Sequence, residues 1–182
     1  MVTFAACGAA DRPGEASAAV AAPALPERFG LGTPVDEARI AAWDVDIRPD
    51  GTGLPPGSGS VEDGAAVYLL RCAACHGPTG TEGPNNRLVG TEAWEDFPAT
   101  RTVGNYWPFA TTLYDYIVRA MPQDSPGTLS ADETYAVIAW ILHRNELIGA
   151  DAVMDASTLP AVEMPARDRF VVDDRLESNV VR

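Results

Sequence analysis

The sequence predicts an all-α fold, and three observations support that prediction. Three segments carry apolar residues at helical spacing, and each begins with a residue typical of a helix start. No segment of useful length alternates apolar and polar residues in the way of a half-buried strand. Apolar residues make up 46% of the 182-residue chain, which is ordinary for a globular protein and enough to bury a core in one domain.

Composition divides the chain into four parts. The N-terminal part is rich in Ala and Pro, which is typical of a tether, and the next part has too much Pro and Gly for long elements. The helices follow, and the last part has two prolines and no strong period. The expected parts are a tether (1–26), an extension that packs on the domain (27–59), the helical domain (60–149) and an extended C-terminal strap (150–182).

Within the extension, residues 34–43 could form a short helix that starts with Pro34. Trp43 and Val45 are large and apolar for a linker. We therefore expect part of the extension to pack onto the domain.

The first long helix is expected to begin after Ser60, because Ser60 and Asp63 have the spacing of a capping box. Helix-forming residues continue from there to the cysteines. Gly64, Tyr68 and Cys72 are four residues apart and therefore share one face of this helix.

The second and third helices have equally clear limits. The second is expected to start at Pro108 and to end before Pro122, since proline suits a first turn and cannot continue a helix. In the third, Ser130 and Glu133 have capping-box spacing ahead of a long apolar run. The expected inner faces are Phe109, Leu113, Ile117 and Ala120 in the second helix, and Val137, Trp140 and Ile141 in the third.

The sequence "CAACH" places two cysteines and a histidine within five positions. C-x-x-C-H is the attachment motif of c-type haem, in which Cys72 and Cys75 form thioethers and His76 ligates the iron. A thioredoxin-like redox pair would need an α/β context, and a zinc site would need more Cys or His ligands than this chain supplies. A structural disulfide remains an alternative, although it would close a very short loop.

The charge of the chain limits its partners. The formal net charge is −13 and every basic residue is arginine, which argues against nucleic acid and against docking on anionic lipid. No apolar run is long enough for a membrane helix. "MVTFAACG" resembles a lipoprotein lipobox, so a lipid on Cys7 would hold an exported protein at the outer face of the membrane or in the periplasm. Only six residues precede Cys7, so such a signal would be truncated or its start misassigned.

Residues 60–148 resemble a class I cytochrome c domain. In that family a glycine and an aromatic residue before the motif cross an aromatic residue on the C-terminal helix, and Gly64, Tyr68 and Trp140 match those positions. The resemblance implies one covalently attached haem c in a protein that carries electrons and is not itself an enzyme.

The same resemblance implies further haem contacts. A Gly-Pro pair after the motif accepts a hydrogen bond from the ligand histidine, and Gly83 and Pro84 supply that pair here. Met121 follows the second helix, as expected of the sixth iron ligand, whereas Met164 comes after the last helix. Four residues between the motif and Met121 could contact the haem propionates: Arg101, Asn105, Tyr106 and Trp107. Of these, Arg101, Tyr106 and Trp107 are expected to bind the haem. Ordinary packing is the alternative for all four.

A narrower resemblance covers about residues 30–172. "VGNYWPFATTLYDYIVRAMP" and "STLPAVEMPARDRF" are similar to the cytochrome c subunits that accompany molybdenum sulfite and sulfane dehydrogenases. The resemblance implies a molybdenum subunit as electron donor and another cytochrome or a terminal oxidase as acceptor. Two alternatives stay open, a membrane-tethered carrier that serves an oxidase directly and a ligand-binding or peroxidase-like haem protein.

Overall fold

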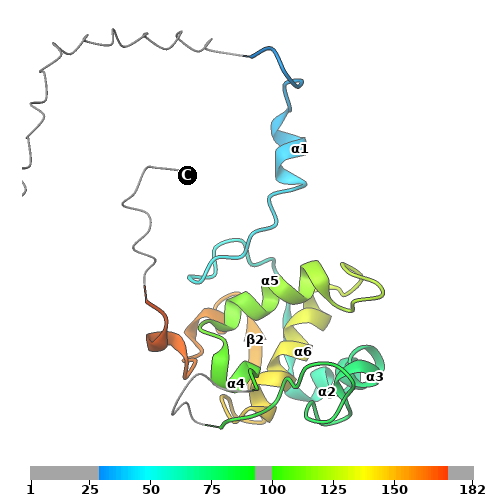
Figure 1. Cartoon of the computed structure of the whole chain (residues 1–182), viewed down its shortest axis with the longest axis vertical. Coiled ribbons are helices and arrows are strands. Elements are labelled where there is room, and N and C mark those ends of the chain that lie inside the picture. Colours follow the sequence, from blue (N-terminus) through cyan, green and yellow to red (C-terminus); the bar gives the residue numbers. More distant parts are fainter. Residues whose placement is uncertain (1–28, 93–99, 172–182) are drawn as a thin grey trace, which may run out of the picture. The chain divides into compact units, whose positions relative to one another are not determined.

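The computed structural model describes residues 29–92 and 100–171, and its main body is helical (Figure 1). The chain divides after Asp36 into two units. The second unit contains α1 (Glu37–Ala41), β1 (Ser58–Ser60), α2 (Val61–Arg71), α3 (Ala73–His76), α4 (Val103–Tyr106), α5 (Ala110–Ala120), α6 (Ala131–Arg144), β2 (Val153–Asp155) and two 3₁₀ turns, η1 (Leu159–Ala161) and η2 (Arg167–Arg169). The prediction of an all-α fold is confirmed for the main body, which is mostly helical, and two short strands are added to it.

Helix α6 is the centre of the body. It contacts α2, α4, α5 and both strands, and all of its residues from Thr134 to Leu142 are buried. The predicted capping box is present, since Ser130 Oγ accepts from the Glu133 amide and the Glu133 carboxylate accepts from the Ser130 amide. The cap lies at the exposed start of the helix, where it gives the first amides of α6 hydrogen-bond partners that the helix itself cannot supply.

The crossing of α2 and α6 follows the sequence prediction. Tyr68 stacks on Trp140 with ring centroids 3.8 Å apart. At Gly64 an added Cβ would lie 1.9 Å from the Ala136 carbonyl oxygen, so only glycine permits this approach. Ser60 caps α2 by accepting from the Asp63 amide, and its hydroxyl donates to the Asp63 carboxylate.

Helix α5 begins two residues later than expected, at Ala110, because Phe109 has the extended backbone of an N-cap. Its apolar face contributes Leu113 and Ile117 to the core, as predicted, and the buried Tyr114 packs against Tyr135 of α6. The helix ends at the cap residue Met121, which precedes the buried Pro122.

Two short strands were not expected. Strands β1 and β2 form an antiparallel pair with Gly59 opposite Met154. An added Cβ on Gly59 would lie 2.2 Å from the Ala136 nitrogen, so β1 lies close against α6. The pair joins the start of the domain to the strap, whose Met154, Leu159 and Met164 are buried in the core.

Part of the extension packs on the domain, but Trp43 and Val45, which motivated that expectation, are exposed. Their exposed fractions are 81% and 44%, and the chain first meets the core at Ile47. From there the extension does pack, since Leu54 contacts the core and the Tyr135 hydroxyl donates to the Pro55 carbonyl over 2.8 Å. The physical reason is that residues 42–45 make only local backbone hydrogen bonds, all of them to residues 38–43. Nothing in that hydrogen bonding holds Trp43 and Val45 against the domain.

Candidate haem site

The C-x-x-C-H segment forms a short helical turn directly after α2. The amides of Cys75 and His76 both donate to the Cys72 carbonyl, at 3.1 and 3.0 Å. Gly77 then turns the chain with a positive φ of 78°. The turn sets the three functional side chains on one short piece of backbone, as attachment of a planar group through two adjacent thiols requires.

The two thiols have different surroundings. Cys72 packs against the core, and this burial raises the pKa of its thiol to about 11, so it is protonated at neutral pH. Cys75 is exposed. A planar group bonded to both thiols would therefore have one attachment point against the core and one at the surface.

The ring of His76 has a defined orientation. Its Nδ1 lies 2.8 Å from the Asn86 carbonyl oxygen. Because a carbonyl can only accept, Nδ1 carries the proton and the Nε2 lone pair is available for a metal. The expected acceptor was the carbonyl of the Gly83–Pro84 pair, so that part of the prediction is corrected to a residue two positions further on.

The loop that carries Asn86 is fixed by backbone contacts. The Asn85 amide donates to the Cys75 carbonyl over 3.0 Å, which pairs the loop with the motif. At Gly83 an added Cβ would lie 2.2 Å from that same Cys75 oxygen. Glycine at position 83 therefore lets the chain pass close behind the motif, and this path, rather than the Pro84 carbonyl, determines where the histidine finds its acceptor.

Asn145, at the end of α6, holds the other end of this loop. The side chain is 1% exposed, and its Oδ1 accepts from the amides of Gly90 and Gly104, at 3.0 and 3.1 Å. Its Nδ2 donates to the carbonyls of Leu88 and Ile141, at 3.1 and 2.8 Å. The amide thus joins α6, α4 and the histidine-supporting loop, a role for which the sequence contains no periodic or motif signal.

Replacing Asn145 by Ala is expected to destabilise the haem-loaded protein by about 3 kcal/mol, because several buried backbone groups would lose their partners. The measurement is urea unfolding followed by far-UV circular dichroism. Asn85→Ala is the matched control, since Asn85 is exposed and should change stability by less than about 0.5 kcal/mol. Equal effects of the two substitutions would contradict the role assigned to Asn145.

Glu82, in the same loop, accepts hydrogen bonds from the Thr79 and Thr81 hydroxyls and from the Thr81 amide. These bonds, that of Thr79 first, lower the pKa of its carboxyl to about 2. A lowered pKa stabilises the fold above the unfolded value of about 4.3, and that contribution is lost as the pH falls toward 2. We expect the melting temperature of Glu82→Gln to fall less than that of the wild type between those pH values. Parallel melting curves across that range would contradict this expectation.

The predicted propionate contacts have other neighbours in the structure. The guanidinium of Arg101 lies 5.1 Å from the centre of the Tyr106 ring, which also meets Phe170 of the strap edge to face. Trp107 is half-buried against the core and meets Tyr116 edge to face. The Asn105 side chain closes the capping box of α4 with Thr102. Contact of Arg101, Tyr106 and Trp107 with haem therefore stays a prediction, as do the roles of Pro84 and Met121.

The core of the domain leaves apolar side chains partly uncovered, as a protein that holds a planar apolar ligand would. Cys72 and Ala73 of the motif are among them. Others are Leu88, Trp107, Val118, Met121 and Leu129. The Nε atom of Arg87 is buried and has no hydrogen-bond partner within the described residues. Within those same residues, no cluster of three or more His, Cys, Asp or Glu side chains could hold a metal ion.

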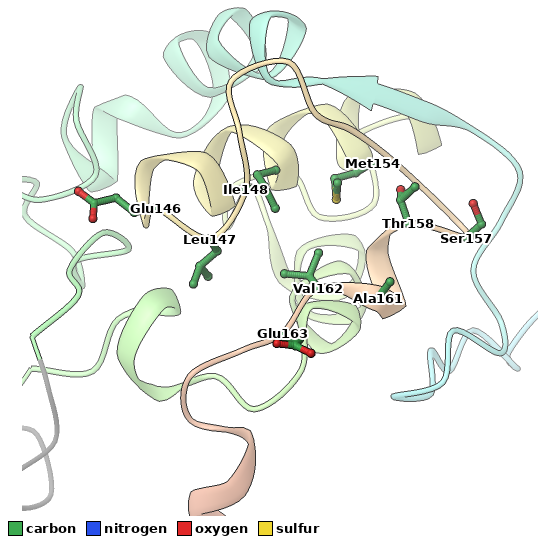
Figure 2. A pocket seen from close by; sticks show the side chains of 9 residues that line it. All are labelled: Glu146, Leu147, Ile148, Met154, Ser157, Thr158, Ala161, Val162 and Glu163. Carbon is green, nitrogen blue, oxygen red and sulfur yellow. The ribbon is translucent and has the colours of Figure 1, made fainter.

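A separate open hollow lies on the strap side of the domain (Figure 2). Leu147, Ile148, Met154 and Val162 line it, with Glu146 and Glu163 among its polar residues. None of its lining residues comes from the motif or from α5, so it is distinct from the candidate haem site. No helix within the described ranges is long and apolar enough to span a membrane.

This fold and this motif are those of a c-type cytochrome, and comparisons with known proteins agree. Residues 59–141 match the family described as cytochrome c oxidase, cbb3-type, subunit III. A chain in the crystal structure of the sulfane dehydrogenase SoxCD from Paracoccus pantotrophus is 38% identical, with a TM-score of 0.73. That match covers 84% of this chain and 76% of the SoxCD chain, whereas no curated protein sequence matches significantly.

The chain therefore belongs to the cytochrome c family and resembles its class I members. Membership implies a covalently bound haem c and a role in electron transfer.

Proposed function

We propose that this protein is the monohaem electron-accepting subunit of a molybdenum dehydrogenase that oxidises sulfite or a sulfane sulfur. The observation that carries the proposal is the extent of the SoxCD match. It covers 84% of the chain, whereas the cytochrome family model covers residues 59–141 alone. The strap and part of the extension are additions to a haem domain, and a likeness that reaches beyond the haem domain favours a shared partner over a shared cofactor alone.

In this proposal Cys72 and Cys75 would hold the haem, and His76 and Met121 would ligate its iron. Haem c supplies an iron that changes between Fe(III) and Fe(II). The Asn86 carbonyl keeps the proton of His76 on Nδ1 and directs Nε2 toward the metal. Met121 is placed by the end of α5, where its amide donates to the Ile117 carbonyl over 2.9 Å. Two protein ligands would suit electron transfer, because they would leave no position on the iron for a substrate.

The test is copurification followed by reduction kinetics. A tagged protein is isolated from its own organism, and molybdenum per haem is measured together with haem reduction on addition of sulfite or thiosulfate. Stoichiometric molybdenum and rapid haem reduction are expected. A purified haem protein that carries no molybdenum and stays oxidised would refute the proposal.

The family description favours a second candidate function, a carrier that passes electrons directly to a terminal oxidase. Rapid turnover with a purified oxidase in the absence of any dehydrogenase would support this alternative. Both candidate functions pass electrons on to the respiratory chain, so they differ in the electron donor. The copurification experiment distinguishes them because it tests for a molybdenum donor.

The proposal includes export to the periplasmic side and a lipid on Cys7, which lies outside the described residues. Cys7→Ser is expected to move the protein from the membrane fraction to the soluble fraction while its haem spectrum is unchanged, because attachment to the bilayer would depend on that thiol. Membrane fractionation with haem staining is the measurement. Equal distribution of both forms would remove the anchor from the proposal.

A further inference from the structure

An apolar stretch precedes the point where the chain meets the domain. Ile40, Trp43 and Val45 have exposed fractions of 49%, 81% and 44%. All residues from 37 to 46 are exposed, although α1 gives part of the stretch a regular backbone. Single exposed apolar residues are common, but an uncovered tryptophan with two aliphatic neighbours within six residues is typical of a binding surface.

The stretch is fixed at its base. The Asp46 carboxylate pairs with Arg119 of α5, and the Ile47 amide donates to Asp115 of the same helix over 3.1 Å. Asp115 and Arg119 are themselves paired, with Nε and Oδ1 2.9 Å apart. Residues 37–45, hereafter the docking arm, therefore leave the domain from a defined place on α5, two residues before Met121.

We propose that the docking arm binds an apolar groove on the molybdenum dehydrogenase subunit, with basic side chains at the edge of that groove. This inference rests on the function proposed above. Trp43 and Ile40 would be the anchors, since tryptophan contributes strongly when it is buried at an interface. Glu37 and Asp44 would face the basic edge.

Charge distinguishes this occupant from two others. A second copy of the chain carries the same net charge of −13, so arm-to-domain contacts between copies would bring like charges together. A lipid surface with anionic head groups is disfavoured for the same reason. A basic-edged protein groove has neither conflict.

The base of the arm connects docking with electron transfer. Nine residues can span at most about 30 Å, so a partner held by the arm stays close to α5 and the helix end that carries Met121. Such tethering raises the effective concentration of the donor near the haem. The arm would therefore increase the number of productive encounters without touching the haem itself.

The experiment compares three tagged proteins purified from their own organism. They are the wild type, a docking-arm variant with Ile40→Ser and Trp43→Ser, and a control with Val171→Ser, a residue 92% exposed elsewhere on the surface. Molybdenum per haem is measured after a salt wash, and the haem spectrum and melting temperature confirm folding. The arm variant is expected to lose molybdenum about 10-fold or more, and the control to match the wild type.

Each outcome has a distinct meaning. Equal molybdenum in the wild type and the arm variant would overturn the docking arm and leave the proposed function intact. Absence of molybdenum from all three proteins would refute the proposed function and, with it, the assigned partner. A wild type that elutes as a dimer of itself, with a monomeric arm variant, would overturn the proposal in favour of a second copy.

Discussion

Replacing Met121 by Leu is expected to abolish the weak far-red absorption band that oxidised His/Met cytochromes show, and to let the reduced protein bind carbon monoxide. Leucine has a similar volume but no sulfur, so the iron would lose its sixth ligand while the helix end keeps its packing. Carbon monoxide binding should rise from undetectable to one equivalent per haem. Visible spectroscopy of both oxidation states measures both effects.

Met164 provides the matched control. It is 4% exposed and lies in the strap beyond the last helix, so Met164→Leu should keep the far-red band and exclude carbon monoxide. A band that survives in Met121→Leu and disappears in Met164→Leu would assign the ligand to the strap. A band absent from the wild type would move the ligand-binding alternative to first place.

Gly64→Ala is expected to lower the free energy of unfolding by at least ~3 kcal/mol, because overpacking against backbone cannot be relieved by rotation of a side chain. The new methyl group would lie 1.9 Å from the Ala136 carbonyl oxygen and 2.9 Å from the Trp140 Cβ. Helices α2 and α6 would have to separate and would weaken the stack of Tyr68 on Trp140. For a chain of this size the melting temperature should fall by about 10 °C.

The control for Gly64→Ala is Ala65→Val on the exposed face of the same helix. It adds more apolar volume than Gly64→Ala, yet it meets solvent and should cost no more than about 0.5 kcal/mol. Thermal unfolding of the two haem-loaded variants measures the difference. Similar melting temperatures would show that the helix crossing tolerates a side chain at position 64.

The long helices were predictable because each one combines a periodic apolar face with a chemical signal at its end. The capping-box residues Ser130 and Glu133 predict the start of α6. Gly64 and Tyr68 of α2 predict the helix that crosses it. Strands β1 and β2 were not predictable, because each has only three residues. Gly59 of β1 has no side chain to show a pattern, and it is buried because its backbone lies against α6. Three residues are too few to show an alternation of apolar and polar residues.

The haem-binding motif was predictable from spacing alone, since five residues carry its whole geometry. The support around it was not. Asn86 acts through its backbone carbonyl. Three of the four hydrogen bonds of the Asn145 side chain reach residues far away in the sequence, at Leu88, Gly90 and Gly104. The prediction for Trp43 failed because a large apolar side chain is expected to be buried, but the sequence does not show whether this chain or a partner buries it.

The backbone origin of the hydrogen bond to His76 has an evolutionary consequence. A carbonyl oxygen is present whatever amino acid stands at position 86, so drift there would leave the imidazole aligned. The vulnerable position is Gly83, which has no side chain of its own. An added Cβ there would lie 2.2 Å from the Cys75 carbonyl oxygen, so no other residue could follow this path without a shift of the backbone. Selection on the iron environment should therefore act most strongly on a residue without a side chain.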